Sequence, residues 1–145
     1  MRFMMMVRAN QESEAGLMPQ DKETEKLFAD MAKYHGELAR AGVLLDATGL
    51  QPSAKGWRIK YSGGKRTVVD GPFAETKELI AGYTLIEVRT RAEAVEWARR
   101  FPAPMGRDAE AEIEVRPLYE MEDFAPNDAV ERLRELEEAR HGSAR

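Results

Sequence analysis

The first third of the chain contains short apolar runs and one long segment whose apolar residues recur at helical spacing. Residues 2–8 form an apolar run with an arginine at each end, which has the length of a buried strand. Asp21 can accept hydrogen bonds from the free amides of a first helical turn, so we expect a helix to begin there. The apolar positions of this helix recur in two adjoining rows: Leu27, Met31, Tyr34 and Leu38, and beside them Phe28, Ala32, His35 and Ala39. Gly42 ends the helix, and residues 43–50 continue as a second strand.

The clearest pattern in the middle of the chain predicts a β-hairpin. Two alternating runs within residues 57–69 are joined by Gly63-Gly64, which tolerate the positive φ angles of a tight turn. A two-residue turn fixes the register, so that Trp57 pairs with Asp70. This register places the aspartate on the apolar face of the hairpin.

The second half of the chain repeats the strand–helix–strand order of the first. Residues 83–88 predict a strand, and Thr90 with Glu93 forms a capping-box pattern at the start of a helix. The buried face of that helix is predicted to hold Ala94, Val95, Ala98 and Phe101. A last strand is expected over residues 113–119. Two β-α-β halves that flank a hairpin predict a ferredoxin-like α+β sandwich, in which two helices cover one face of an antiparallel sheet.

The other face of this sheet has no predicted cover. The strands are apolar at both of their alternating positions, through Met4, Met6, Trp57, Ile59, Tyr61, Val68, Val69, Leu85 and Ile86. An apolar patch of this kind marks an interface or a ligand groove. We therefore expect two copies to pack sheet against sheet as a homodimer, with a lined cavity between them.

Composition narrows the function classes. The chain has 22 Lys and Arg residues against 26 Asp and Glu residues, a net charge of −4, which disfavours a protein that binds nucleic acid directly. Cysteine is absent, and His35 and His141 are the two histidines, so disulfides, thiolate metal sites and three-histidine zinc sites are excluded. The sequence predicts neither a metal nor a cofactor. Its apolar runs are too short for a secretion signal or a membrane span, so we expect a cytoplasmic protein without membrane partners.

Residues 125–145 differ from the domain that residues 1–124 form. They are dense in charge, with a thin apolar stripe at helical spacing made by Val130, Leu133, Leu136 and Ala139. Such a stripe suits a short helix that docks on the body or on a partner subunit. A solvated, frayed helix explains the same pattern equally well.

His35 and Asp70 are the candidate catalytic residues. His35 is the histidine within the predicted core, and an imidazole there can act as a general acid or base near neutral pH. Asp70 shares its hairpin face with apolar residues, where a carboxylate is costly without a partner, and Pro72 has no amide to offer it. Together they suggest a His–Asp pair in which the carboxylate orients the imidazole. Each also has a structural interpretation: a helix histidine bonded to a carbonyl, and an aspartate that forms a turn.

Weaker candidates surround this pair. Three aromatic residues either line a pocket or belong to the core: Trp57, Tyr61 and Phe73. Three charged residues are lesser candidates that fit ordinary strand or loop positions equally well: Asp46, Glu75 and Lys77. The hairpin tip either attracts an anion or is a solvated turn, and its basic residues are Arg58, Lys60, Lys65 and Arg66.

One segment resembles a known protein family. Residues 70–78 read Asp-Gly-Pro-Phe-Ala-Glu-Thr-Lys-Glu and are followed by Gly-Tyr-Thr-Leu-Ile-Glu-Val at residues 82–88. Both stretches closely resemble the signature of the YCII-related family, in its DGPF-domain branch, and the similarity covers residues 1–118. The resemblance implies a dimeric α+β barrel of ferredoxin-like subunits with a cleft between sheet and helices. It also implies a catalytic histidine on the first helix and a catalytic aspartate near the hairpin, which His35 and Asp70 match.

These features lead to one functional hypothesis and one alternative. We expect a homodimer that binds a small organic molecule and, without a cofactor, transfers a proton as a lyase or isomerase does, with His35 as acid or base and Asp70 as its orienting partner. The alternative is a non-catalytic ligand-binding or regulatory module. Some members of the family are encoded beside, or fused to, sigma factors, which implies a sigma factor or another transcription component as a partner.

Overall fold

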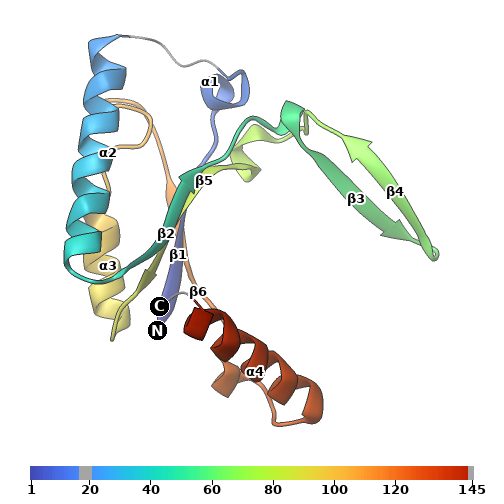
Figure 1. Cartoon of the computed structure of the whole chain (residues 1–145). Helices are drawn as coiled ribbons and strands as arrows, with labels where there is room; N and C mark the ends of the chain where they lie inside the picture. The colour runs from blue at the N-terminus through green and yellow to red at the C-terminus, as the bar shows by residue number, and fades with distance from the viewer. Residues whose placement is uncertain (17–20, 144–145) are drawn as a thin grey trace.

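The computed structural model describes residues 1–16 and 21–143, and a four-stranded antiparallel sheet forms the centre of the molecule (Figure 1). The strands lie in the order β2-β5-β1-β6. Their bounds are Arg2–Arg8 for β1, Leu44–Gly49 for β2, Ile80–Glu87 for β5 and Ile113–Pro117 for β6. Helix α2 (Lys22–Arg40) connects β1 to β2, and helix α3 (Arg91–Arg99) connects β5 to β6. This order confirms the predicted ferredoxin-like α+β sandwich.

Helices α2 and α3 cover the same face of the sheet, and the core lies beneath them (Figure 1). Along β1 the side chains alternate, so that Phe3 and Met5 are buried under the helices while Met4 and Met6 point to the other face. The buried core consists of Phe3, Met5, Tyr34, Leu38, Ile86, Val88 and Ala94. The ring of Tyr34 makes edge-on contacts with Trp97 and Phe101, which tie α2 to the end of α3.

Helix α2 begins at the predicted residue. Asp21 accepts a hydrogen bond from the backbone amide of Thr24 at 2.8 Å, and this bond lowers the pKa of Asp21. In the first predicted row, Tyr34 and Leu38 are buried and Leu27 and Met31 are partly buried. The two adjoining rows together predict a wide apolar face turned to the core, but Phe28 of the second row is 53 % exposed. The sheet covers a narrow stripe of this helix, so the expected wide buried face was wrong.

Helix α3 begins where the sequence predicts, but its buried face differs from the prediction. The hydroxyl of Thr90 accepts a hydrogen bond from the amide of Glu93 at 3.1 Å, as the capping pattern predicts. The Glu93 carboxylate accepts from the amide of Arg89 at 3.3 Å. Ala94 is buried, but Val95 is 36 % exposed, so its assignment to the core was wrong.

Among the described residues, none of the helices has both the length and the apolar composition that a membrane span needs.

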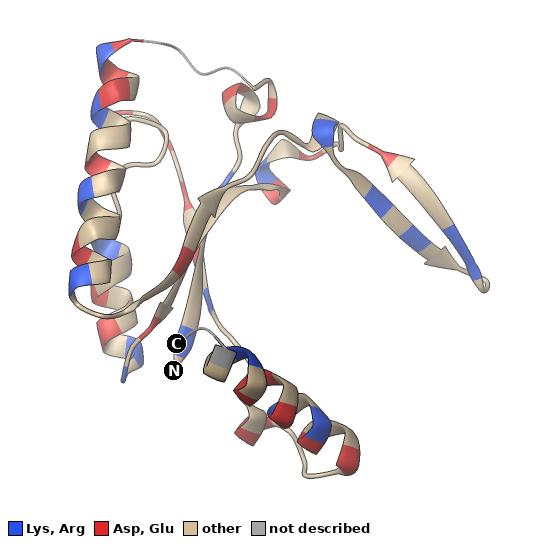
Figure 2. Ribbon diagram, in the orientation of Figure 1, with Lys and Arg blue, Asp and Glu red and all other residues tan. Residues whose placement is uncertain are grey.

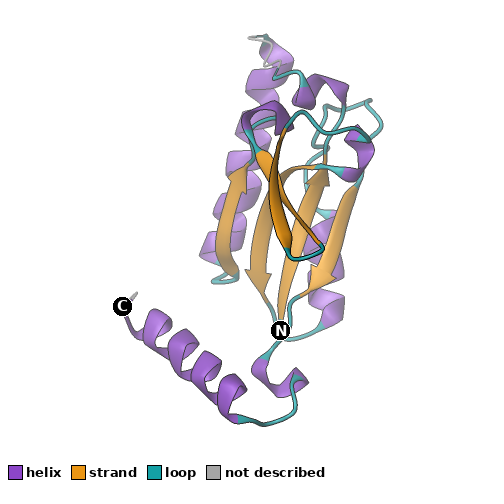
Figure 3. Cartoon of the chain, turned by 90° about the vertical axis from the view of Figure 1, so that its right-hand side faces the viewer, coloured by secondary structure: helices purple, strands orange, loops and turns teal. Residues whose placement is uncertain are grey.

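Strands β3 (Trp57–Ser62) and β4 (Lys65–Asp70) form a separate two-stranded sheet, which we call the arm. The arm projects from one end of the molecule on the side that the helices leave uncovered, and basic residues mark much of its length (Figure 2). Seen from that side, it stands in front of the four-stranded sheet (Figure 3). Its register pairs Trp57 with Asp70, and the turn residue Gly63 has a φ of 56°, as the hairpin prediction requires.

The arm changes the expected composition of the uncovered face. Several apolar residues that the strand pattern places on the sheet lie on the arm instead: Trp57, Ile59, Tyr61, Val68 and Val69. Ile86 does not lie on the uncovered face either, because its side chain is fully buried under the helices. Trp57 and Tyr61 are 65 % and 70 % exposed, so their interpretation as core residues was wrong. The apolar part of the uncovered face is formed by Met4, Met6 and Leu85.

Helix α4 (Asp128–Ser143) lies on the uncovered side too, at the end of the sheet opposite the arm (Figure 1). The guanidinium of Arg2 connects this helix to the body, since it lies 3.1 Å from carboxylate oxygens of both Glu120 and Glu137. The hydrogen bond to Glu120 raises the pKa of Arg2. One side of α4 is therefore docked on its own chain, while Leu133 and Leu136 remain 53 % and 58 % exposed.

Candidate functional site

His35 lies on α2 and is held between this helix and the sheet. Its Nδ1 lies 2.8 Å from the carbonyl oxygen of Met31, and its Nε2 lies 2.8 Å from Oγ1 of Thr84 on β5. A carbonyl oxygen only accepts, so Nδ1 carries the proton and Nε2 of the neutral ring accepts from the Thr84 hydroxyl. Tyr34 and Phe101 contact the ring edge-on. Both ring nitrogens are therefore engaged within the chain, as in the structural interpretation of a helix histidine.

Asp70 lies at the base of the arm, where it ends β4 with an exposed side chain. The arm extends on the uncovered side of the sheet, whereas α2 with His35 lies on the covered side (Figure 1). The hydrogen bonds of the His35 ring go to Met31 and Thr84, so the structure does not bring His35 and Asp70 together. The His–Asp pair stays a prediction.

The Asp-Gly-Pro-Phe segment fixes the base of the arm against Ser53. The amide of Gly71 donates to the carbonyl of Gly56 at 3.0 Å, and the amide of Phe73 donates to Oγ of Ser53 at 3.1 Å. A Cβ added at Gly71 would lie 1.8 Å from the carbonyl oxygen of Ser53, which leaves no room for a side chain. Packing at the arm base therefore requires glycine at the second position of the motif.

Glu14 completes this junction from a distant part of the sequence. It belongs to the short helix α1 (Gln11–Glu14), and its carboxylate accepts hydrogen bonds from the amide of Ser53, at 3.0 Å, and from the Ser53 hydroxyl. Neither α1 nor this contact is among the predicted features. Asn10 and Ser13 form a reciprocal capping box at the start of α1, and this pair was the available signal.

The predicted pocket-lining aromatic residues lie on or beside the arm. The guanidinium of Arg58 lies 3.8 Å from the ring centre of Phe73, and that of Arg66 lies 5.1 Å from the ring centre of Tyr61. Trp57 stands at the arm base, opposite Asp70 in the register. Within a single chain, Phe73 and Tyr61 lie against arginines and Trp57 is exposed to solvent. Their role in a pocket therefore stays a prediction.

Glu75 and Lys77 lie in the segment that links the arm to β5. Glu75 adopts a left-handed backbone with a φ of 60°, directly before the short helix η2 (Thr76–Glu78), and Lys77 is exposed within η2. Their side chains are on the surface, as the loop interpretation predicts.

Within residues 1–16 and 21–143, no three His, Asp or Glu side chains gather in a way that would hold a metal ion.

The uncovered face of the sheet combines an apolar centre with one polar pair. Met4 pairs with Leu85 and Met6 with Tyr83 across β1 and β5, and all four side chains are partly exposed. The hydroxyl of Tyr83 donates to Oδ2 of Asp46 on β2 at 2.9 Å. This hydrogen bond raises the pKa of Tyr83, because the phenol must stay protonated to donate it.

The Asp46–Tyr83 pair is the polar feature that the sequence analysis ranked too low. Asp46 was a lesser candidate, and Tyr83 was not a candidate. The second oxygen of Asp46 accepts from the amide of Ala47 at 2.9 Å, so the carboxylate is held in one orientation. Strand alternation was the available signal, since it places Tyr83 on the face opposite Thr84 and Ile86.

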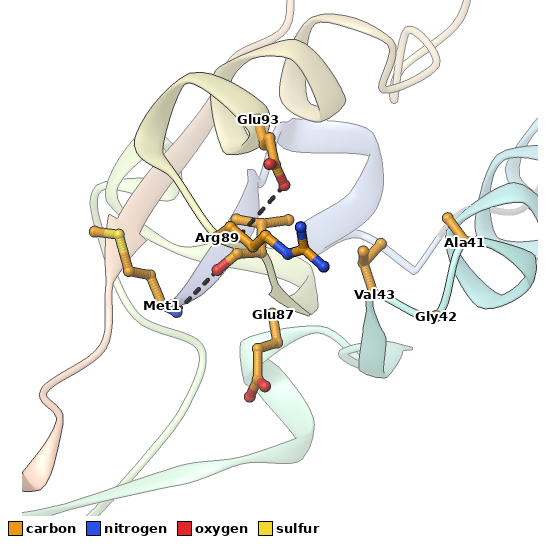
Figure 4. A pocket seen from close by; sticks show the side chains of 8 residues that line it. Met1, Ala41, Gly42, Val43, Glu87, Arg89 and Glu93 are labelled. Atoms are coloured by element: carbon orange, nitrogen blue, oxygen red, sulfur yellow. Dashed lines mark hydrogen bonds between the residues drawn. The ribbon is translucent and has the colours of Figure 1, made fainter.

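Two surface depressions lie at the end of the sheet next to Met1. One, of about 570 Å³, is lined by Met1, residues 41–43, residues 87–89 and Glu93 (Figure 4). Within it, the Met1 amino group donates to the carbonyl of Val88 at 2.8 Å. The other, of about 670 Å³, lies where β6 leads into the short helix η3 (Met121–Asp123). Neither depression is lined by the predicted catalytic residues.

Comparison with known proteins relates the chain to one family and to two individual proteins. Residues 1–122 match the YCII-related domain. An uncharacterized protein of Rhizobium meliloti (strain 1021) is 33 % identical over 97 residues, which cover 67 % of this chain and 77 % of that protein. A solved structure of 5-chloro-2-hydroxyhydroquinone dehydrochlorinase from Burkholderia phenoliruptrix, in complex with 2,5-dihydroxybenzoquinone, aligns with a TM-score of 0.42 at 11 % identity, over 82 % of this chain and 94 % of that one. The match over residues 1–122 and the identity to the rhizobial protein show that the chain belongs to the YCII-related family.

Proposed function

We propose that this protein is a homodimer that binds a small organic molecule between the uncovered faces of its two sheets. The observation that carries the proposal is the uncovered face, where Met4, Met6 and Leu85 form an apolar surface that the chain does not cover itself. Two sheets can pack face to face about 10 Å apart, and their inner side chains and a ligand would share the space between them. Such packing by a second copy would bury these residues and form the dimeric α+β barrel.

The Asp46–Tyr83 pair suggests the class of ligand. A carboxylate has about four lone-pair sites, so Asp46 can accept a further hydrogen bond beside those from Tyr83 and Ala47. Small-molecule sites combine a mostly apolar lining with a few oriented polar groups. The uncovered face has both elements. It fits a ligand with an apolar body and a hydroxyl or amino group that donates to Asp46.

Proton transfer by His35 and Asp70 is a separate, catalytic proposal, because His35 lies on the covered side of the sheet and the ligand proposed above lies on the uncovered side. Family resemblance supports it, and so does the ring orientation that leaves Nε2 as the basic nitrogen of His35. Neutral imidazole has a single acceptor, which the Thr84 hydroxyl occupies at 2.8 Å. Proton exchange with a ligand therefore requires the bond between His35 and Thr84 to open.

The ligand proposal is tested by a thermal-shift screen of small organic metabolites on three proteins: the natural chain, Asp46→Asn and the control Glu23→Gln. Glu23 is an exposed carboxylate in the first turn of α2. A ligand that binds the folded protein raises its melting temperature. We expect a ligand whose shift is reduced by Asp46→Asn and unchanged by Glu23→Gln. Equal shifts in all three proteins would contradict the proposed place of the ligand.

The catalytic proposal is tested with every compound of the screen that raises the melting temperature. We expect the natural chain to convert one of them, and His35→Gln and Asp70→Asn to give no product in a mass-spectrometric assay. Binding without conversion by the natural chain would contradict catalysis. That result would favour the non-catalytic ligand-binding or regulatory module.

A further inference from the structure

The arm presents an apolar surface to solvent. Trp57, Ile59, Tyr61 and Val68 share one of its faces in the observed register, and they are 65 %, 40 %, 70 % and 63 % exposed. A two-stranded ribbon is marginally stable in water unless a further element covers its apolar face. Contiguous apolar patches on a folded surface mark interaction sites. The arm face is therefore expected to pack against another surface.

Helix α4 presents a second uncovered apolar surface. Leu133 and Leu136 lie three positions apart on the helix and therefore on one face, where they are 53 % and 58 % exposed. Val130, Arg134 and Glu137 are partly buried on the neighbouring side of this helix. The ion pair between Arg2 and Glu137 holds that side on the body. The two leucines therefore lie beside the docked side of the helix and stay more than half exposed.

The arm and the segment around α4 differ in net charge. The arm contains one acidic residue, Asp70, against four basic ones, Arg58, Lys60, Lys65 and Arg66; of these, Arg66 and Asp70 share the apolar face in the register. The segment around α4 is mostly acidic, with Glu120, Glu122, Asp123, Asp128, Glu131, Glu135, Glu137 and Glu138 against Arg132, Arg134 and Arg140. Figure 2 shows blue bands along the arm with a red band near its base, and red bands mixed with blue ones along α4. Complementary charges of this kind favour association and fix its register.

The positions of the arm and α4 match across a two-fold axis. The arm is inserted between β2 and β5 at the end of the sheet where Arg8 pairs with Ile80, and α4 is tied to the other end of β1 at Arg2. Both lie on the uncovered side (Figure 1). A two-fold axis that runs across the strands exchanges the two ends, so it brings the arm of one copy to α4 of the other. The six-residue strands of the arm span about 20 Å, which is close to the length of the sheet. The arm is therefore long enough to reach α4 of the other copy.

We propose that, in the homodimer, the apolar face of each arm packs against Leu133 and Leu136 of the second copy. This inference rests on the proposed homodimer and adds a specific contact to it. The contact uses α4, which lies outside the residues that match the family. It accounts for the exposed arm face, the exposed leucines and their opposite charges through a single partner, a second copy of this chain.

The absence of cysteine from the natural chain allows a direct test by disulfide cross-linking. Tyr61→Cys and Leu136→Cys are made in separate chains, one with a mass tag, and the two proteins are mixed and mildly oxidised. A disulfide requires Cα atoms about 4.4–6.8 Å apart. We expect a cross-linked heterodimer from this mixture. The matched control Lys60→Cys lies on the opposite face of the arm and, mixed with Leu136→Cys, should lose that product.

The mass of each mixture before oxidation tests the homodimer separately from the contact between the arm and α4. A dimer by light scattering without the Tyr61–Leu136 cross-link would overturn the contact between the arm and α4 and leave the homodimer standing. A monomer would overturn both. The double variant Leu133→Ser/Leu136→Ser gives a second measurement, because both residues are exposed in the single chain. We expect its dimer to dissociate at higher protein concentration than the natural dimer, and unchanged dissociation would contradict the proposed contact.

Discussion

The body of the sheet and the arm are built from the same alternation of apolar and polar residues, yet their apolar faces end in different surroundings. In β1, Phe3 and Met5 are 5 % and 0 % exposed under the helices. In β3, Trp57 and Tyr61 are 65 % and 70 % exposed. Strands β1 and β5 are each followed in sequence by a helix, α2 or α3, that covers the sheet, whereas β3 is followed by its hairpin partner. Alternation determines which side of a strand is apolar, and neighbouring elements determine whether that side is buried.

The largest expected effect comes from removing a side chain from the covered core. Leu38 is fully buried on α2, so Leu38→Ala should lower the free energy of unfolding by about 2–5 kcal/mol. The matched change on the arm is Val68→Ala, at a position 63 % exposed. Measured by urea unfolding of the dissociated monomer, it should cost roughly 0.5 kcal/mol or less. Equal losses at the two sites would contradict the difference between body and arm.

The second effect concerns the junction between the two regions. Gly71→Ala places a Cβ 1.8 Å from the carbonyl oxygen of Ser53, so we expect a loss of about 1–3 kcal/mol and a displaced arm. At Gly56 the added Cβ would lie 3.7 Å from the same oxygen, an ordinary contact. Gly56→Ala is therefore the control. Urea unfolding should rank the two variants in this order, and equal stability would show that the junction tolerates a side chain at Gly71.

A third effect tests the burial of the body through pH. Burial raises the pKa of Tyr34 to about 12, whereas an unfolded tyrosine ionises near pH ~10. Between these values the unfolded chain loses a proton that the folded chain keeps. The stabilisation is therefore complete below about pH 10 and is lost as pH rises towards 12.

Tyr34→Phe removes both this pH dependence and the hydrogen bond to the carbonyl of Trp97 at 2.7 Å. We expect a loss of about 1 kcal/mol at neutral pH and a flatter stability profile above pH ~10. Tyr119→Phe, at a residue 74 % exposed, is the control and should keep the natural profile. A natural profile in Tyr34→Phe would mean that another group governs the alkaline loss of stability.

The smallest effect on the single chain is expected at the tip of the arm. Tyr61→Ser should change the stability of the dissociated monomer by roughly 0.5 kcal/mol or less, because the ring is 70 % exposed. The same change should weaken the dimer, which analytical ultracentrifugation over a dilution series measures. A monomer strongly destabilised by Tyr61→Ser would show that the chain itself already uses this side chain.

The sequence predicts the body and the internal register of the arm because both depend on neighbouring residues. Asp21 marks the start of α2, and Gly63 with Gly64 sets the pairing of Trp57 with Asp70. The direction of the arm is different, because it depends on Glu14, Ser53 and Gly71, which are far apart in the sequence. No periodic pattern reports such a contact.

The candidate site was predictable in part for the same reason. The position of His35 at the edge of the α2 face follows from helical spacing. Its partner Thr84 does not, because the pairing depends on which residue of β5 lies beneath that turn of the helix. The Asp46–Tyr83 pair likewise depends on the register between β2 and β5, which contains a bulge after Leu44.

In the proposed homodimer a second copy covers the uncovered faces of the sheet and the arm, and the most direct test is the mass of the natural protein in solution. Size-exclusion chromatography with light scattering at micromolar concentration measures it. We predict a particle of twice 16.4 kDa that dissociates on dilution. A particle of 16.4 kDa throughout the micromolar range would contradict the homodimer and, with it, the ligand site between two sheets.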